Sequence, residues 1–265
     1  MKGSEFRMIA VIGGTGLNDS ELFKVKEKKK VFTPFGMTSD LLTITDFNGR
    51  EVVFLPRHSE QHVIPPHKIN FKANIWALKE LGVKKVLGVC AVGSLKKEFK
   101  PRDFVLVDQF IDFGKDLTTF FDSGQFYHVS LAEPFCQVLR NDLSETLKEL
   151  NLSFHSTGTY ARISGPQFST KAASKFYRQF ADVIGMTGVP EAILCREQQL
   201  CYSILASVTD YDVWAEKPVN LNEVQETMKL NLENTKKVLE KAIERIDLNS
   251  GKECSCEKAL DGAKA

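Results

Sequence analysis

The feature that most constrains the fold is the alternation of short apolar runs with segments of helical periodicity. Residues 69–81 and 134–150, and the segment that begins at Asn222, carry apolar side chains three and four positions apart, which predicts helices. Buried strands are predicted at residues 8–12, 51–55, 85–90, 104–107 and 202–208. Such alternation is typical of an α/β domain. We therefore expect one such domain at residues 8–248.

Local signals set the expected helix ends. Gly82 is expected to end the first helix as a C-terminal cap. Pro134 is tolerated in the first turn of the second helix. Asn222, with Gln225 three residues later, predicts a start resembling a capping box for the last helix.

Composition narrows the class of partner. The 265 residues carry a formal net charge of +1, so no extended basic surface for nucleic acid is expected. The chain has no run of eighteen apolar residues and no signal-peptide layout, which predicts no membrane association and a cytoplasmic location. A small-molecule ligand suits this balance. Residues 1–7 resemble a cloning remnant and are left out of the fold prediction.

Six cysteines occur, and reduced, mostly buried thiols are the expectation for a long intracellular chain. Cys254-Ser255-Cys256 stands apart, because it lies in a polar tail, residues 249–265, that we expect to be loosely ordered. This CxC pair is compatible with a redox pair, half of a metal site or chance. Three pairings stay open at this point: Cys136 with Cys201, Cys195 with a tail cysteine, and Cys254 with Cys256.

A glycine turn, Gly13-Gly14-Thr15-Gly16, follows the first predicted strand. Backbone amides at such a turn approach anions closely, and Thr15 adds a hydroxyl. A dinucleotide fingerprint is a second interpretation, but Asp19 stands where its third glycine is needed. A turn that binds no ligand is the third.

Arg57 and His58 directly follow another predicted strand. Ligands of open α/β sheets gather at the carboxyl ends of the strands, and an arginine fork suits phosphate. Ser94, in the turn after residues 85–90, is a further candidate donor to the same anion. The spacing of His58, His62 and His67 fits no standard zinc pattern, so no metal is predicted there.

Two further segments carry polar chemistry. Phe168 lies in a hydroxyl-rich loop, residues 163–170, and either stacks on a planar base or packs in the core. Asp210 and Asp212 end the last predicted strand. They are interpreted either as a solvated strand end or as a general acid of raised pKa that faces a nitrogen base.

Five short segments occur in a characteristic order and spacing: VIGGTGL, LPRH, AVGSL, GPQFST and VTDYDVWAEKPV. Together they resemble the 5′-methylthioadenosine phosphorylase branch of the trimeric-type purine nucleoside phosphorylases, and the CxC tail resembles that of thermophilic members. The resemblance implies a single-domain fold with a mixed, partly barrel-like central sheet flanked by helices. It also implies a trimer or hexamer of identical subunits, and inorganic phosphate as co-substrate without a cofactor.

The resemblance further implies roles for individual residues. Asp210 and His58 would be catalytic, and Asp210 would assist the departing purine. The implied phosphate ligands are Thr15, Arg57, His58, Cys90, Ala91 and Thr187. The implied nucleoside ligands are Met186 at the ribose, Phe168, Ser169, Asp210 and Asp212 at the base, and Leu221, Val224 and a neighbouring subunit's His128 at the 5′ substituent. An aspartate pair accepts from a 6-amino group, which favours adenine over 6-oxopurines.

The chain also departs from the family pattern. Ser59 replaces a glycine, Ser164 replaces a glutamate, and the stretch after Asp112 differs. If Ser59 needs a positive φ, the Arg57–His58 loop would be displaced. The alternatives are therefore a 6-oxopurine or methylthioinosine phosphorylase, a homologue that binds nucleosides without turnover, and, less favoured for lack of the third glycine, a nicotinamide-dependent oxidoreductase.

Overall fold

A mixed sheet of eleven strands forms the centre of the chain in the computed structural model, which describes residues 8–14, 17, 24–216, 219–248 and 254–265. The strands are β1 (Met8–Gly13), β2 (Lys24–Lys29), β3 (Leu42–Phe47), β4 (Arg50–Pro56), β5 (Val83–Ser94), β6 (Phe104–Leu106), β7 (Gln109–Asp112), β8 (Phe154–His155), β9 (Thr159–Arg162), β10 (Val183–Gly185) and β11 (Cys201–Asp210). The α-helices are α1 (Phe71–Glu80), α2 (Gln137–Glu149), α3 (Lys171–Tyr177), α4 (Gly188–Glu197) and α5 (Leu221–Arg245). This confirms the predicted α/β class.

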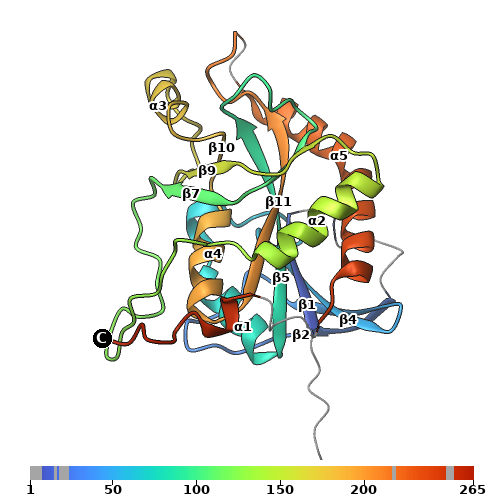
Figure 1. Cartoon of the computed structure of the whole chain (residues 1–265), viewed down its shortest axis with the longest axis vertical. Coiled ribbons are helices and arrows are strands. Elements are labelled where there is room, and N and C mark those ends of the chain that lie inside the picture. Colours follow the sequence, from blue (N-terminus) through green and yellow to red (C-terminus); the bar gives the residue numbers. More distant parts are fainter. Residues whose placement is uncertain (1–7, 15–16, 18–23, 217–218, 249–253) are drawn as a thin grey trace, which may run out of the picture.

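The centre of the sheet is parallel and is covered by helices on both faces. β1 pairs in parallel with β4 and β5, and β11 pairs in parallel with β5. Along β1, Ile9 and Val11 join the core cluster beneath α2 and α5, whereas Ala10 and Ile12 join the cluster beneath α1 and α4. Figure 1 shows these two helix pairs on opposite sides of the strands. Because both faces are buried, the strands read as continuous apolar runs in the sequence.

The long strand β5 explains the barrel-like part of the sheet. One edge of β5 pairs first with β1 and then, at residues 93–94, with β10, while its other edge pairs with β11. From β11 the pairing continues to β6, and from β10 it continues through β9 to β7. Only residues 107 and 108 separate β6 from β7, so this one bent stretch closes the ring of strands.

Three predicted helix starts are wrong by two or three residues. α1 begins at Phe71 rather than at residue 69, with Asn70 as its N-cap. α2 begins at Gln137 with Cys136 as its N-cap, so Pro134 lies outside the first turn. α5 begins at Leu221, because the Asn220 side chain accepts a hydrogen bond from the amide of Glu223 at 3.0 Å. Asn220 with Glu223 offers the same capping chemistry as the predicted Asn222 with Gln225, and sequence spacing does not distinguish them. Gly82, at φ +84°, follows α1 as predicted.

The expectation of a loosely ordered tail is wrong for residues 254–265. Cys256 is buried, and the His128 amide donates to the carbonyl of Ala263 at 2.8 Å. A β-bridge joins Tyr127 to Lys264. Figure 1 shows the C-terminus beside the long loop that precedes α2. Among the described residues, no helix is both long enough and apolar enough to span a membrane.

Candidate active site

The Arg57 guanidinium lies at the carboxyl end of β4 and is held by a carboxylate that the sequence analysis missed. Its Nε donates to Glu191 Oε1 at 2.5 Å, and its Nη2 donates to Glu191 Oε2 at 2.9 Å. The two side chains are only 2% and 1% exposed. Nη1 also donates to the carbonyl of Val89, and Nη2 to that of Ile12. The fork predicted to hold phosphate therefore holds Glu191.

Glu191 accepts hydrogen bonds from a second side chain as well as from Arg57. The Tyr202 hydroxyl donates to Glu191 Oε2 at 2.7 Å. Burial by itself would lower the pKa of Arg57, but the adjacent Glu191 carboxylate outweighs burial and raises it. Glu191 occurs in the VPEA segment in the first turn of α4, but no sequence signal pairs it with Arg57, 134 positions away. The pair fixes Arg57 between the ends of β1 and β4 and the middle of β5.

His58 is held as a neutral imidazole. Its Nδ1 lies 2.8 Å from the carbonyl oxygen of Ile64, which only accepts, so Nδ1 carries the proton and Nε2 has a free lone pair. Burial, followed by the positive charge of Arg57, lowers the pKa of His58 to about 4. His58 can therefore accept a hydrogen bond from a protonated phosphate oxygen, or take up a proton when an anion binds beside it.

The N-terminus of α4 completes the anion end of the site. Thr187 is the N-cap of α4, and its Oγ1 lies 3.8 Å from Cys90 Sγ. The amide groups of a helix N-terminus favour negative charge. Burial raises the pKa of Cys90, so the thiol stays protonated and is a weak hydrogen-bond donor. The neighbouring Ala91 is exposed. Thr15, also predicted here, lies outside the described residues.

Ser59 adopts a left-handed backbone conformation, which favours glycine. Its φ is +69°, and its amide donates to the carbonyl of Pro56 at 3.2 Å. The Ser59 carbonyl accepts from the His62 amide, and the Ile64 amide donates to the carbonyl of His58. These turn hydrogen bonds hold Ser59 at a positive φ within the Arg57–His58 loop.

Asp210 ends β11 at the other end of the site. Its Oδ1 accepts from the amide of Asp212 and its Oδ2 accepts from the Thr209 hydroxyl, both at 2.7 Å. Burial raises the pKa of Asp210 despite these two donors. A cavity of about 310 Å³ opens onto it, with walls formed by Asp210, Tyr211, Asp212, Ala215, Glu216, Val219 and Glu223. The interpretation as a solvated strand end is wrong, because both aspartates are buried.

Asp212 and Ser169 each keep a buried polar atom that has no hydrogen-bond partner in the described part of the chain. Asp212 Oδ2 and Ser169 Oγ make no hydrogen bond with the described residues. Asp212 also has a φ of +50°, and burial raises its pKa. A buried unpaired acceptor costs about 1–3 kcal/mol, and strained backbone concentrates where ligands bind. These atoms are suited to hydrogen-bonding a ligand.

The segment that includes Met186 connects the two ends of the site. Ile184 of β10 pairs with Gly93, three residues along β5 from Cys90, and a strand rises about 3.3 Å per residue. A Cβ on Gly93 would lie 2.9 Å from Asp210 Oδ1, so only glycine admits that carboxylate. A Cβ on Gly165 would lie 2.4 Å from the Met186 sulfur, so the loop of residues 163–170 packs over Met186. Roughly 10 Å therefore separates Cys90 from Gly93 along β5, with Met186 between the two ends.

The remaining predicted residues lie around this site or apart from it. Phe168 is 44% exposed on its loop, which excludes the interpretation as a core residue. Leu221 is 60% exposed at the first turn of α5, and Val224, one turn on, is half-buried next to the cavity residue Glu223. His128 lies on the tail-bound segment, with its ring 5.4 Å from that of Phe126. Its amide donates to the carbonyl of Ala263 in the tail at 2.8 Å.

Two more sequence interpretations change in the structure. Ser94 Oγ donates to the carbonyl of Lys96 and accepts from the Lys96 amide, so it is not a donor to the anion end. Ser164 Oγ accepts from the Lys115 amide at 3.0 Å, and the buried Arg162 pairs with Asp112 and Asp116. The altered stretch after Asp112 is therefore anchored by an ion-pair network that the sequence analysis missed.

Comparison with known proteins agrees with this arrangement. A family model described as the phosphorylase superfamily matches residues 8–244. The S-methyl-5′-thioadenosine phosphorylase of Nitrosopumilus maritimus is 51% identical over 258 residues, which is 97% of this chain and 97% of the relative. A methylthioadenosine phosphorylase from an antarctic soil metagenomic library matches in structure with a TM-score of 0.91, at 38% identity, over 98% of this chain and 93% of that chain. The Schistosoma mansoni methylthioadenosine phosphorylase in complex with adenine matches with a TM-score of 0.91, at 32% identity, over 97% and 99%.

Proposed function

The chain belongs to the phosphorylase superfamily, and from this premise we propose that it splits 5′-methylthioadenosine with inorganic phosphate into adenine and 5-methylthioribose 1-phosphate. The observation that carries the proposal is the pair of buried carboxylates, Asp210 and Asp212, at the wall of the cavity at the end of β11. One of their oxygens, Asp212 Oδ2, has no partner among the described residues and can accept a hydrogen bond from a ligand.

The aspartate pair recognises and activates the base. As the glycosidic bond breaks, the departing purine gains negative charge, and a protonated Asp210 can donate to N7. Its raised pKa, caused by burial, keeps a proton available for that step. Asp212 Oδ2 accepts from the 6-amino group of adenine. A 6-oxopurine would present an acceptor to this oxygen and leave both unpaired, which disfavours hypoxanthine and guanine.

Phosphate supplies the nucleophile at the opposite end. Attack at C1′ proceeds while the sugar carries oxocarbenium-like positive charge, and the phosphate stabilises that charge. Thr187, the Cys90–Ala91 backbone and the N-terminus of α4 would hold the anion, with His58 Nε2 accepting from its P–OH group. Arg57 would contribute positive charge near the anion without donating its paired N–H groups to it, because Nε and Nη2 already donate to Glu191. Thr15 is proposed as a further ligand from the sequence alone.

Met186 lies between the two ends and is proposed to contact the ribose, with Phe168 and Ser169 against the base. Leu221 and Val224 give the 5′ end an apolar boundary near the cavity. Apolar surface favours a methylthio group over a hydroxyl, although only about 10–200-fold. His128 is proposed to reach the 5′ substituent from a neighbouring subunit of a trimer or hexamer.

A nucleoside panel tests the proposal. Methylthioadenosine, adenosine and inosine are incubated with and without phosphate, and release of the free base is measured. We expect phosphate-dependent adenine release with methylthioadenosine as the best substrate. The Asp210→Asn variant should lose roughly 10²–10⁴ in kcat, because Asn cannot donate a proton. A clear preference for inosine would contradict the base assignment, and tight binding of methylthioadenosine without turnover would identify a non-catalytic homologue.

A further inference from the structure

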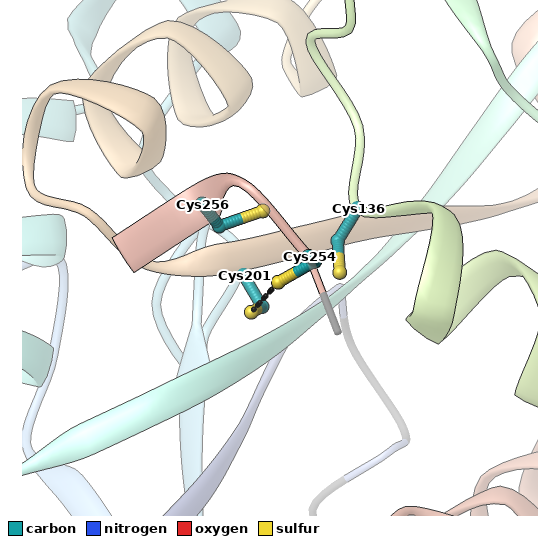
Figure 2. Close-up of side chains that lie close together, drawn as sticks. All are labelled: Cys136, Cys201, Cys254 and Cys256. Atoms are coloured by element: carbon teal, nitrogen blue, oxygen red, sulfur yellow. Dashed lines mark hydrogen bonds between the residues drawn. The ribbon is translucent and has the colours of Figure 1, made fainter. Parts of the chain in front are cut away.

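Four of the six cysteines meet at one point of the fold, outside the site described above. Cys136, Cys201, Cys254 and Cys256 come from three segments that are far apart in sequence. Their Sγ atoms all lie within 4.8 Å of one another, and those of Cys201 and Cys254 are 3.5 Å apart. Figure 2 shows the four side chains turned toward a common centre. We propose that this cluster is a tetrathiolate site for one Zn²⁺ ion.

The geometry matches a tetrahedral ion. Zn²⁺ binds thiolate sulfur at about 2.3 Å, so the edges of a regular tetrahedron of four sulfurs are about 3.8 Å. The sulfurs of this cluster lie at or within about 1 Å of that spacing. Four soft sulfur ligands in this arrangement select zinc over magnesium or calcium. All four cysteines are free thiols in the structure, so no sulfur is committed to a single partner.

The ligands are mounted on ordered elements. Cys136 is the N-cap of α2, Cys201 is the first residue of β11, and Cys256 opens the short 3₁₀ helix at Cys256–Lys258. Three of the thiols are buried and Cys254 is half-buried, which leaves one side by which an ion can enter. A structural zinc site needs four such protein ligands and no open position.

Positive groups near the cluster would stabilise the negative charge of a zinc tetrathiolate. When Zn²⁺ binds, the four thiols release their protons to solvent and four Zn–S bonds form, giving a site with a net charge of −2. Arg196 Nη2 donates to the hydroxyl of Ser255, which lies between the two tail cysteines, at 3.3 Å. This guanidinium, together with the positive N-terminal end of α2 at Cys136, offsets the added negative charge.

Metal binding would join the tail to the body of the fold. The tail beyond Cys256 holds the segment of residues 126–128 through the amide of His128 and through the amide of Ala265, which donates to the carbonyl of Phe126 at 3.3 Å. Cys136 and Cys201 belong to the core beneath α2 and α5. The proposed ion therefore crosslinks α2, β11 and the tail, and it does not depend on the function proposed above.

Metal analysis of the full-length chain, purified with a reductant present, tests the proposal. We expect one zinc per chain, and strong visible absorption from tetrahedral thiolate coordination when Co²⁺ replaces zinc. The C254S/C256S double variant should lose both the zinc and the cobalt band, because two ligands remain. C195A is the matched control: Cys195 is a buried thiol outside the cluster, and its loss should leave the zinc content unchanged.

Two outcomes would overturn the proposal. One is a fully reduced, folded chain that takes up neither Zn²⁺ nor Co²⁺. The other is an intact mass, measured without reductant, that lacks four hydrogens while peptide mapping finds these four cysteines in disulfides. Both measurements use the unaltered protein, so they decide the matter even if a variant fails to fold.

Discussion

Replacing Glu191 by Gln removes the charge that holds Arg57 while keeping the size of the side chain. In the native chain, two charge-assisted hydrogen bonds of 2.5 and 2.9 Å join the pair, and neither residue is more than 2% exposed. In the variant, one oxygen can still accept from Arg57, but the amide NH₂ points donors at Nη2 and at the Tyr202 hydroxyl. The guanidinium is then a buried charge without a counterion.

The cost can be worked out from this geometry. Removing one partner of a buried ion pair costs about 3–5 kcal/mol, and the remaining amide acceptor returns about 1 kcal/mol. The free energy of unfolding should therefore fall by about 2–4 kcal/mol. For a chain of this size, that corresponds to a drop in Tm of roughly 4–16 °C. Denaturant titration and thermal melts followed by circular dichroism give both quantities.

Glu197→Gln is the matched control, because Glu197 lies in the same helix α4 and is also buried. It accepts hydrogen bonds from Thr119 and Phe120 but forms no ion pair with any described residue. Burial raises the pKa of Glu197, so losing its charge should cost about 1 kcal/mol or less. Phosphate supplies a second readout. If Arg57 faces the anion, the fork freed by Glu191→Gln should bind phosphate, which would then raise the Tm of the variant more than that of the wild type.

The reasoning is refuted if Glu191→Gln costs no more than Glu197→Gln, since the pair would then contribute nothing beyond a neutral contact. Equal stabilisation of wild type and variant by phosphate would separately remove Arg57 from the anion end of the site.

Three further predictions concern single residues. Because the pKa of His58 is lowered to about 4 from 6.5, the unfolded chain binds its proton more readily, so up to about 3 kcal/mol of stability present above pH 6.5 is lost as the pH falls toward 4. His58→Gln should flatten that part of the stability profile, and an unchanged slope would contradict the neutral assignment. Gly93→Ala places a Cβ 2.9 Å from Asp210 Oδ1 and should lower kcat/KM at least roughly tenfold. The same Cβ would lie 3.1 Å from Ile184 Cγ2, so a loss of about 1–3 kcal/mol of stability is also expected. Unchanged kinetics would show that the position of Asp210 is unimportant. Ser59→Gly removes the left-handed strain at φ +69° and should leave the free energy of unfolding equal or raise it by up to about 1 kcal/mol. Ser59→Ala keeps the strain and should not raise the free energy of unfolding. Denaturant titration of both variants compares them.

The sequence by itself predicted the α/β class and most of the elements, because those depend on local patterns. Strands such as β1 and β4, buried on both faces, appear as unbroken apolar runs. Asp210 and Asp212 were predicted to recognise the base from their place at a strand end and from the family resemblance, and the structure adds their burial. The start of α5 was misplaced because two Asn residues, Asn220 and Asn222, offer equal caps, and only the backbone shows that Asn220 is used.

Which side chains face one another follows from the packing of the elements, which the sequence does not show. Arg57 was predicted to grip phosphate, and its fork instead grips Glu191, a residue 134 positions away that no local pattern links to it. The sequence showed Cys254 and Cys256 as half of a metal site at most, whereas the fold brings Cys136 and Cys201 to them. The physical reason is the same in both cases: charge pairing and metal binding depend on distances of a few ångströms, and chain separation does not encode those distances. Local periodicity specifies elements, and packing of the elements specifies the partners.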